Sequence, residues 1–551
     1  METFDYAIVG AGSAGCVLAD RLSEDGGDRV LLLECGGSDR SIWIQMPSAL
    51  SIPMNMERYD WRYWTEPEPN LSGRRLHTPR GKVLGGSSSI NGMVYVRGNA
   101  LDFECWQQEG ASGWGFADVL PYFRRAEAYA RGGDEYRGAD GPLATRRGEL
   151  ANPLHAAWRE AGRQAGYPFT ADMNGFQQEG FGDMDMTVAG GRRCSTANAY
   201  LRPAMRRANL AVRTHALATR ILFEGRRAVG VRYRRGAHVR DVRVRREVIV
   251  SAGAINSPQL LKLSGVGPAE ELAACDIDLV HELRGVGENL QDHLELYFQV
   301  ASREPVTLYT HMSRWRKALI GVRWLLAHDG LGATNHFETG GFIRSAAGVR
   351  YPDIQFHFLP VAVSYDGSSL AREHGFQAHV GPMRSRSLGW VRLRSAQPSD
   401  PPRIRFNYMS RPEDWTQMRA CVRLTREIFA QPAFDRYRGR EISPGAEVQS
   451  DAEIDAFIRA RAESAFHPCG SCRMGASSDP LAVVDPETRV IGLEALRVVD
   501  SSIMPSITTG NLNAPTIMLA EKAADHIRGR TPLPPTPAPY YIAAGWERAQ
   551  R

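Results

Sequence analysis

The fold is decided near the N-terminus by the stretch Phe4-Asp5-Tyr6-Ala7-Ile8-Val9-Gly10-Ala11-Gly12-Ser13-Ala14-Gly15. Its first half is largely apolar and predicts a buried strand, and its second half is a GxGxxG turn. A helical pattern with apolar residues at Val17, Leu18 and Leu22 follows, and the apolar run 29–33 predicts a second strand. Strand, glycine turn, helix and strand together predict a βαβ unit of the kind that binds dinucleotides.

Each glycine of the turn has a separate role. Gly10 allows the tight turn, Gly12 lets the backbone approach a pyrophosphate, and Gly15 lets the helix pack closely on the strand. The free N–H groups at the helix N-terminus then favour the phosphate charge. Glu34 ends the second strand, at the distance where an acid accepts hydrogen bonds from a ribose. NAD and FAD enzymes share this motif, so it does not choose between them. The predicted dinucleotide contacts of this unit are Gly10, Gly12, Ser13, Ala14, Gly15 and Glu34.

The composition is typical of a soluble globular protein. The 551 residues are 43% hydrophobic and 23% charged, and the length predicts about two to four domains. The net charge of +5 is too small to indicate a nucleic-acid surface, and the arginines are scattered along strand-like segments. We therefore expect no nucleic-acid partner.

The cysteines and the lack of targeting signals indicate a cytoplasmic location. The eight cysteines are spread through a long chain, which is the pattern of free thiols in a reducing compartment. No signal peptide precedes the strand at Phe4, and no run of about 18 apolar residues occurs. We expect no transmembrane segment, and the sequence leaves peripheral association with the inner membrane open.

A second glycine-rich segment reads Arg80-Gly81-Lys82-Val83-Leu84-Gly85-Gly86-Ser87-Ser88-Ser89-Ile90-Asn91-Gly92. It is a poor helix and a poor strand, but such a loop presents many backbone N–H groups to a phosphate or a ring. Its apolar residues Val83, Leu84 and Ile90 indicate that the loop is buried. The predicted cofactor contacts of this loop are Gly85, Gly86, Ser87, Asn91 and Gly92.

Strand signals return between residues 210 and 250, and a helix follows with Pro258 near its first turn. Residues 496–499 predict one more buried strand, which we expect beside the N-terminal strand, and Asp500 at its end is a predicted cofactor contact. Residues 301–464 mix long apolar strands with aromatic residues and histidines, which indicates a separate antiparallel sheet with covering helices.

The fold class predicted from these patterns is α/β, or α+β overall. It combines a Rossmann-like cofactor domain with a discontinuous, antiparallel-sheet substrate domain. The expected boundaries are 1–150, 196–300 and 465–531 for the cofactor domain, 151–195 and 301–464 for the substrate domain, and 532–551 for a C-terminal tail.

Two segments near the C-terminus carry further chemistry. One reads Ala465-Phe466-His467-Pro468-Cys469-Gly470-Ser471-Cys472-Arg473-Met474-Gly475, and the other reads Thr508-Thr509-Gly510-Asn511-Leu512-Asn513-Ala514-Pro515. With the two glycine-rich segments, they make the chain resemble the glucose–methanol–choline (GMC) family of FAD-dependent oxidoreductases. The resemblance covers nearly the whole chain. It is most detailed for the choline-oxidising members, through residues 285–293, 335–338 and 509–513.

The resemblance implies an FAD-dependent enzyme that oxidises an alcohol to an aldehyde by hydride transfer to flavin N5. His467 matches the family's catalytic histidine, and an imidazole can accept the hydroxyl proton near neutral pH. Asn511 matches its partner, whose amide would hydrogen-bond the substrate oxygen, and it also counts among the expected cofactor contacts. Related choline oxidases tether the flavin to a histidine that corresponds to Ile90, so we expect no tether at this position.

The resemblance also implies choline as the substrate. Glu338 matches a carboxylate that faces the trimethylammonium group in choline-oxidising relatives, and Trp61 and Phe466 are candidate walls of the site. A quaternary cation donates no hydrogen bonds and is held by charge and by ring faces. An uncharged primary alcohol is the alternative substrate. The electron acceptor, whether quinone, soluble carrier or oxygen, and the oligomeric state are left open.

Rival interpretations rest on single patterns. His336-Phe337-Glu338 and Pro468-Cys469-Gly470-Ser471-Cys472 together spell the HxE…PCxxC signature of zinc deaminases. The spacing between its two halves is far too long for that fold, and the N-terminal unit would stay unexplained, so no metal is expected. Cys469 and Cys472 are interpreted as structural thiols rather than as a redox pair.

Overall fold

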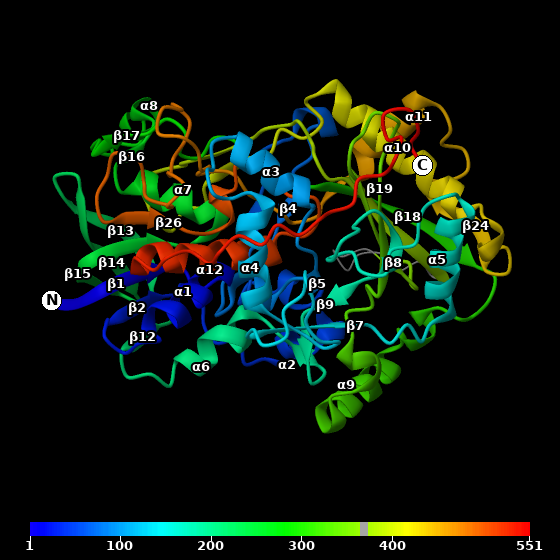
Figure 1. Ribbon diagram of the computed structural model, residues 1–551, viewed down its shortest axis with the longest axis horizontal. Coiled ribbons are helices and arrows are strands. Elements are labelled where there is room, and N and C mark those ends of the chain that lie inside the picture. Colours follow the sequence, from blue (N-terminus) through cyan, green and yellow to red (C-terminus); the bar gives the residue numbers. More distant parts are fainter. Residues whose placement is uncertain (364–372) are drawn as a thin grey trace.

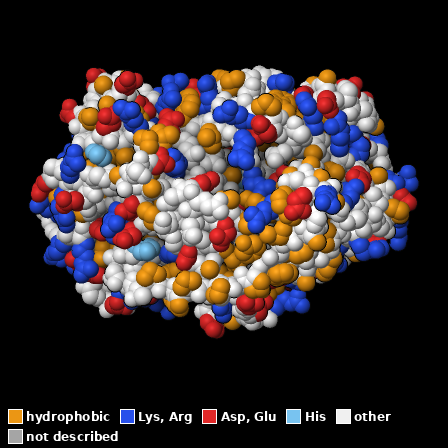
Figure 2. All heavy atoms as spheres, turned by 45° about the horizontal axis from the view of Figure 1, so that its top comes forward, with side chains coloured by type: hydrophobic (Ala, Val, Ile, Leu, Met, Phe, Trp, Pro, Cys, Tyr) orange, Lys and Arg blue, Asp and Glu red, His pale blue; other side chains and the backbone are white. Residues whose placement is uncertain are grey.

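The computed structural model describes residues 1–363 and 373–551. Two large sheets lie side by side, with helices on their faces (Figure 1). On the face shown in Figure 2, acidic and basic side chains are interspersed. The mixed α/β architecture confirms the predicted fold class.

The first sheet is built around the N-terminal βαβ unit. Its core strands are parallel, and β13 and β14 extend it as an antiparallel pair. In spatial order the strands are β12 (Leu210–Arg213), β2 (Val30–Leu33), β1 (Glu2–Val9), β15 (His238–Val250), β14 (Arg227–Arg235) and β13 (Leu217–Glu224), with β26 (Leu496–Val498) paired to the end of β15.

The position of β26 corrects one expectation. This strand pairs with Val248–Val250 of β15, so β15 separates it from β1, beside which it was expected. The N-terminal half of β15 pairs with β14, and β26 occupies the same side of β15 further along. Because β15 is long, two partners share one of its edges, and the sequence contains no signal for this division. Asp500 still emerges at the carboxyl end of the parallel strands.

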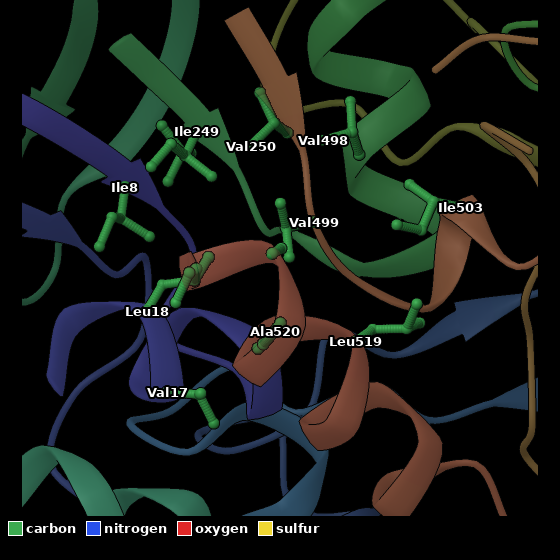
Figure 3. Packing of buried hydrophobic residues seen from close by; sticks show 14 of the residues in the cluster. Ile8, Val17, Leu18, Ile249, Val250, Val498, Val499, Ile503, Leu519 and Ala520 are labelled. Carbon is green, nitrogen blue, oxygen red and sulfur yellow. The ribbon is translucent and has the colours of Figure 1, made fainter. Parts of the chain in front are cut away.

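Helices α1 (Ser13–Ser23) and α12 (Asn513–Arg528) pack against each other beside this sheet (Figure 1). Figure 3 shows Leu18 of α1 and Ala520 of α12 on the side that faces the strands, and both belong to the same buried cluster as Ile8 and Val499. Gly529 ends α12 in the left-handed conformation, with φ of 64°, as expected for a helix C-terminus. Residues about 500 positions apart in sequence thus form one core.

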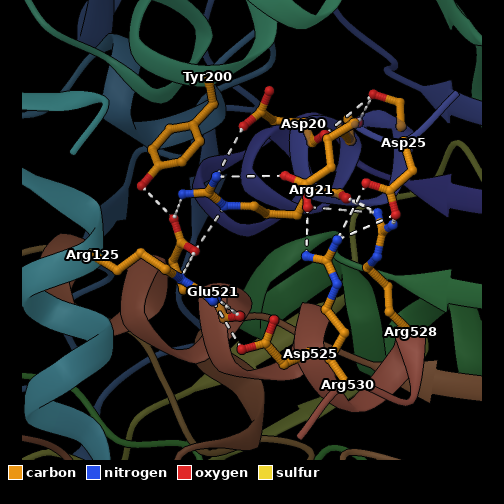
Figure 4. Close-up of polar contacts among 12 residues, drawn as sticks. Asp20, Arg21, Asp25, Arg125, Tyr200, Glu521, Asp525, Arg528 and Arg530 are labelled. Carbon is orange, nitrogen blue, oxygen red and sulfur yellow. Dashed lines mark hydrogen bonds and ion pairs between the residues drawn. The ribbon is translucent and has the colours of Figure 1, made fainter. Parts of the chain in front are cut away.

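A buried carboxylate also joins these two helices (Figure 4). Glu521 of α12 is fully buried. It accepts two hydrogen bonds of 2.9 Å from Arg21 of α1, one of 2.8 Å from Arg125 and one of 2.8 Å from the hydroxyl of Tyr200. A buried charge is tolerated only when it is paired and hydrogen-bonded, and Glu521 meets both conditions.

Replacing Glu521 with glutamine should lower the free energy of unfolding by about 3 kcal/mol, because Arg21 and Arg125 both lose their bonds to a fully buried negative charge. Arg125 keeps its ion pair with Asp525. The matched control is Glu24→Gln, which removes a partly exposed partner of Arg530 and should cost less than about 1 kcal/mol. Urea unfolding followed by circular dichroism measures both variants. Equal losses would contradict the assigned role of Glu521.

The second sheet is antiparallel throughout. In spatial order its strands are β24 (Arg438–Ser443), β18 (Leu294–Ser302), β21 (Gly375–Pro382), β20 (Ile354–Leu359), β19 (Thr339–Ile343) and β8 (Gly180–Asp183), and β25 (Glu463–Ser464) also pairs with β18. The strand β18 starts before residue 301, so it crosses the expected domain boundary.

Helices and small sheets complete the structure. The remaining helices are α2 (Ile42–Gln45), α3 (Ala100–Gln108), α4 (Phe116–Ala126), α5 (Pro153–Gln164), α6 (Arg202–Ala204), α7 (Gly253–Leu263), α8 (Ala269–Ala273), α9 (Arg314–Ala327), α10 (Pro412–Phe429) and α11 (Asp451–Arg461). The small sheets contain β3 (Tyr63–Trp64), β4 (His77–Thr78), β5 (Val94–Tyr95), β6 (Glu127–Tyr129), β7 (Leu143–Arg147), β9 (Asp185–Met186), β10 (Val188–Ala189), β11 (Arg192–Arg193), β16 (Val266–Gly267), β17 (His281–Glu282), β22 (Trp390–Arg392) and β23 (Arg403–Arg405). Pro258 lies in the second turn of α7 rather than the first.

The pleat of the second sheet separates an apolar face from a polar one. On β20, Phe356 and Phe358 join an aromatic cluster with Trp158 of α5 and Phe429 of α10. The intervening residue His357 therefore points the opposite way, since successive side chains alternate across a strand. This alternation places polar side chains toward the first sheet.

Candidate active site

One cavity of about 290 Å³ joins the two sheets. It extends from the GxGxxG turn at the end of β1 to the polar face of the second sheet. Most of the residues predicted to bind cofactor or substrate line it, although they come from distant parts of the chain. Those that line it are Gly10, Gly12, Ser13, Ala14, Glu34, Trp61, Gly86, Ser87, Asn91, Gly92, Phe466, His467, Asp500 and Asn511.

The GxGxxG turn has the geometry that its sequence predicts. Gly10 has φ of +100°, and a Cβ on it would lie 2.5 Å from the carbonyl oxygen of Ser251. Gly15 lies outside the cavity lining, where a Cβ would approach the carbonyl oxygen of Gly10 to 1.8 Å. It therefore permits close packing of α1, as expected. No described side chain caps the N-terminus of α1 at Gly12, so its N–H groups suit an anion.

Glu34 lies at this end of the cavity. Its two carboxylate oxygens accept hydrogen bonds from the backbone N–H groups of Ala11, at 2.9 Å, and Gly36, at 2.7 Å. Burial raises the pKa of Glu34 to about 7. The carboxylate thus ties the glycine turn to the end of β2, and each oxygen keeps a second lone pair that can accept from a ribose hydroxyl.

The second glycine-rich loop packs directly on the first. A Cβ on Gly86 would lie 2.6 Å from the Cα of Gly12, and Gly85 donates its N–H to the carbonyl of Ala11 at 2.7 Å. Gly85 itself supports the loop from outside the cavity lining. Arg193, which sequence analysis missed, is buried and donates to the carbonyl and the side-chain oxygen of Asn91 at 2.7 and 2.8 Å.

Asp500 combines a place in the cavity lining with a structural role. Its Oδ2 accepts from the N–H of Gly253 at 2.9 Å and from the hydroxyl of Ser257 at 2.6 Å, and its Oδ1 accepts from Ser502 N at 2.7 Å. The aspartate therefore holds the start of α7 against the turn after β26. These contacts shape the cavity wall between the two glycine-rich loops and the second sheet.

His467 and Asn511 form a pair in the cavity. Asn511 Nδ2 lies 3.1 Å from His467 Nε2, His467 Nδ1 lies 3.0 Å from His293 Nδ1, and His293 Nε2 lies 3.0 Å from the carbonyl oxygen of Met383. A carbonyl only accepts, so His293 carries its proton on Nε2 and accepts the Nδ1–H of His467 on Nδ1. His467 Nε2 therefore keeps a lone pair, to which Asn511 donates.

Neighbouring groups fix the orientation of the Asn511 amide. Its Oδ1 lies 3.2 Å from Gln355 Nε2 and 3.3 Å from His357 Nε2, both on β20. Since the oxygen faces these two groups, the amide nitrogen faces His467. The loop before Asn511 is tied down by Asp102, which accepts from the N–H and the hydroxyl of Thr509 at 2.7 and 2.9 Å.

The electrostatic surroundings keep His467 neutral. Burial, with further contributions from His293 and His357, lowers the pKa of His467 well below its usual range. Burial also lowers the pKa values of His293 and His357, each to about 4. The buried imidazoles of His293 and His357 thus lie beside the half-buried His467, and all three are neutral. His467 is therefore available as a proton acceptor at neutral pH.

Asp292 holds the backbone of His467. Its Oδ1 accepts the His467 N–H at 2.6 Å, and its Oδ2 accepts from Tyr408 and Ser464 at 2.6 and 2.5 Å. Burial raises the pKa of Asp292 to about 6. The carboxylate is a positioning residue that sequence analysis missed, although the family-like run 285–293 contains both it and His293.

Glu338 lies elsewhere, which corrects the predicted arrangement. It does not line the cavity. Its Oε2 accepts the backbone N–H of Leu150 at 2.7 Å, its Oε1 accepts the hydroxyl of Thr334 at 2.6 Å, and His155 Nε2 lies 3.8 Å away. Both oxygens are thus engaged by the protein. Its neighbour Phe337 lines the cavity instead, because consecutive side chains point in different directions.

Glu295 of β18 is the carboxylate of the second sheet that lines the cavity. Its Oε1 lies 3.1 Å from His379 Nδ1. Gln377 Oε1 accepts the backbone N–H of Val363 at 2.9 Å, so its Nε2 donates to His379 Nε2 at 2.7 Å. His379 Nδ1–H therefore donates to Glu295, and this hydrogen bond orients the carboxylate.

Aromatic rings line the cavity together with Glu295. Trp61 stacks on Tyr63 with ring centroids 5.8 Å apart, and Phe337 meets the rings of His357 and His379 edge-on at 5.7 and 5.8 Å. Phe466, next to His467, also contributes. A carboxylate among ring faces is the arrangement that recognises quaternary ammonium groups.

The residues of the rival patterns are in different surroundings. Cys469 and Cys472 are fully buried in the core of the first sheet and are unpaired, and Glu338 is bound by Leu150 and Thr334. The described part of the chain contains no group of three or more histidine, cysteine or acidic side chains that could hold a metal ion. These thiols therefore pack as core residues.

Comparisons with known proteins identify the family of this chain. Patterns of the GMC oxidoreductase family match residues 4–295 and 385–520. A protein from Brucella ovis named oxygen-dependent choline dehydrogenase is 59% identical over 547 residues, which are 99% of this chain and 100% of that protein. The protein of the same name from Photobacterium profundum is 56% identical over 552 residues, covering 100% of this chain and 97% of that protein.

Solved structures also share the fold. Pyridoxine 4-oxidase from Mesorbium loti is 31% identical with a TM-score of 0.87, over 96% of this chain and 99% of that one. A formate oxidase from Aspergillus oryzae, studied for its FAD modification, is 25% identical with a TM-score of 0.90, over 96% and 98%. Family patterns over most of the chain and relatives along its full length establish that the chain belongs to the GMC oxidoreductase family.

Proposed function

We propose that this protein is an FAD-dependent alcohol dehydrogenase that oxidises choline to betaine aldehyde. The observation that carries the proposal is that one cavity contains both a neutral histidine, His467, whose Nε2 lone pair points at the amide of Asn511, and a carboxylate among aromatic rings, Glu295. The full-length relatives named choline dehydrogenase support the same reaction.

The cavity fits FAD at its dinucleotide end. The uncapped N-terminus of α1 suits the pyrophosphate, Glu34 suits a ribose, and the loop at Gly86 closes on Gly12 where any Cβ would intrude. When bound, FAD supplies the hydride acceptor. Ile90 lines the cavity at the position where related choline oxidases carry a tethering histidine, and its side chain cannot form such a bond.

The chain's own residues bind the alcohol and take its proton. Glu295 and the rings of Trp61, Phe337 and Phe466 attract the trimethylammonium group. The Nε2 lone pair of His467 accepts the hydroxyl proton as hydride leaves the carbon. The Nδ1–H of His467 continues to donate to His293, which stabilises the imidazolium ring that forms.

Asn511 completes the proton site. Its Nδ2 donates to His467 Nε2 in this structure, and the same amide can donate to the substrate oxygen when the alcohol enters. Because Gln355 and His357 hold the amide oxygen, this donor is oriented before the substrate binds. The alternative, an uncharged primary alcohol as the natural substrate, would leave the Glu295 carboxylate without a counter-charge.

The electron acceptor and the cellular setting are part of the proposal. The relatives' shared name, oxygen-dependent choline dehydrogenase, favours oxygen over a quinone or a soluble carrier. The described residues contain no helix long and apolar enough to cross a membrane. Cytoplasmic location and contact with the inner membrane stay predictions. The boundaries between the cofactor domain, the substrate domain and the C-terminal tail stay predictions as well.

Anaerobic mixing tests this function. Choline should bleach the absorbance of the oxidised flavin, whereas 3,3-dimethylbutan-1-ol, which has the same shape without the charge, should bleach it at least about 10²-fold more slowly at equal concentration. Stopped-flow absorbance measures both alcohols. Equal rates would remove choline from the proposal and keep the alcohol oxidation, and no bleaching by either would refute both.

A further inference from the structure

Helix α9 (Arg314–Ala327) projects from the body of the molecule, at the lower edge of Figure 1. Its sequence is Arg-Trp-Arg-Lys-Ala-Leu-Ile-Gly-Val-Arg-Trp-Leu-Leu-Ala. Ser313 caps its start and His328, in the left-handed conformation, ends it. The proposed reaction uses none of these residues.

One side of α9 is fixed to the protein. Trp324 is only 2% exposed and packs with Met46, Ala49 and Ala333, and its indole N–H donates to the carbonyl of Gly191 at 2.7 Å. This anchor holds the helix in a defined orientation, so the opposite side faces outward.

The outward side of α9 carries an apolar stripe. Trp315, Leu319, Val322 and Leu326 follow one another at intervals of four, three and four residues, which places them on one helix face. Trp315 is 73% exposed and Leu326 is 82% exposed. Isolated exposed apolar residues are common, but a continuous stripe on one helix marks an interaction surface.

Basic side chains border this stripe. Arg316 and Arg323 lie three residues before and four residues after Leu319, and therefore on one edge of the stripe. Arg314 lies on the other edge, and all three are exposed. The helix itself contains no acidic residue, and Asp329, just beyond it, pairs with Arg323.

We infer that α9 docks the protein on a membrane surface that contains anionic phospholipid. The apolar stripe would enter the boundary between headgroups and acyl chains, with Trp315 in the interfacial region that tryptophan favours. The bordering arginines would contact the lipid phosphates, since an anionic surface attracts basic side chains beside it. A second protein copy would place the same arginines against each other, so charge complementarity favours the bilayer.

The test uses the full-length holoenzyme and sucrose-loaded vesicles. The wild type should sediment with phosphatidylcholine–phosphatidylglycerol vesicles, at a ratio of about 2:1, and much less with phosphatidylcholine alone. The double variant Trp315→Ser/Leu326→Ser should lose at least about tenfold in vesicle partitioning. The control Val239→Ser removes a residue of similar exposure, 60%, on β15, and should bind as the wild type does.

Charge is tested separately. Arg314→Gln/Arg316→Gln should weaken binding to the anionic vesicles, whereas Arg227→Gln/Arg245→Gln, exposed on the first sheet, should not. Light scattering without vesicles measures the oligomeric state of the wild type and of each variant. The inference is overturned if the wild type does not bind anionic vesicles, or if the Trp315→Ser/Leu326→Ser variant binds them equally well. A wild type that does not bind vesicles but forms a dimer, which this variant converts into a monomer, would assign the stripe to a protein interface instead. Choline turnover in solution should be unchanged in every variant.

Discussion

Replacement of His467 with alanine should slow reduction of the bound flavin by choline roughly 10²–10⁴-fold while FAD stays bound. The variant removes the Nε2 lone pair that accepts the hydroxyl proton, together with the partner of Asn511 Nδ2 and of His293 Nδ1. The hydrogen bonds of His467 run to Asn511, His293 and Asp292 rather than to the glycine turn at Gly12, so cofactor content should be preserved. Rapid-mixing absorbance measures the reduction rate, and the protein-bound flavin spectrum measures FAD content.

The matched control is His238→Ala, an exposed histidine at the start of β15, which should reduce its flavin at the wild-type rate. A near-normal rate in the His467 variant would eliminate the histidine as the proton acceptor. Loss of FAD from the variant would instead indicate a structural role, so the two measurements separate the outcomes.

The pH profile gives a second, independent readout of His467. Its pKa lies below its usual range because of burial, so the neutral, active form persists as the pH falls below neutrality. We expect kcat/KM for choline to stay flat down to about pH 6.5, the ordinary histidine pKa, and to decline only in more acid solution, as protonation removes the lone pair. The residual activity of the alanine variant should lack this decline.

Local sequence patterns predicted the geometry of the glycine turn and most residues that line this end of the cavity, while their contact with the cofactor stays a prediction. Local residue types and their spacing determine this end of the cavity. They fix the backbone conformation of the GxGxxG turn, the position of Glu34 at the end of its strand and the close approach of the loop at Gly86. His467 and Asn511 came from a family resemblance, because nothing local distinguishes a catalytic histidine from a buried core histidine. The pairing of these two residues is a property of the folded chain.

The second sheet shows what local sequence patterns did not predict, namely which carboxylate faces the cavity. Glu338 ends one family-like segment and Glu295 follows another. A one-residue shift in strand position turns a side chain to the other face. The register of β18 against β21 places Tyr297 opposite His379, and Glu295 lines the cavity. A signal was present in β18 itself, because Glu295, Tyr297 and Gln299 alternate with apolar residues.

Helix α9 illustrates the same limit on the surface. Its sequence is apolar on two sides, and the pattern alone does not say which side is covered. The structure buries Trp324 and leaves Trp315 exposed. The difference arises because Gly191 and the loops at Met46 and Ala333 meet the helix on one side only, which is a tertiary relationship that has no signature in residues 314–327.

Replacement of Glu295 with glutamine should weaken choline binding roughly 10²-fold, which corresponds to about 3 kcal/mol. Glutamine keeps the shape of the side chain and can still accept the Nδ1–H of His379, so the main change is the loss of negative charge at a buried position in a cavity with aromatic walls. The uncharged analogue 3,3-dimethylbutan-1-ol should lose less than about threefold, because it has no positive charge for the carboxylate to attract. The concentration dependence of flavin reduction measures both affinities.

Glu338→Gln is the control that decides between the two carboxylates. Glu338 is as buried as Glu295, but its oxygens accept from Leu150 and Thr334 and do not face the cavity. Its variant should therefore affect both alcohols alike, through stability. If Glu338→Gln selectively weakened choline and Glu295→Gln did not, the cation would be bound outside the described cavity. Selectivity confined to Glu295 would show that the charge recognising choline and the base accepting its proton share one cavity, 172 positions apart in sequence.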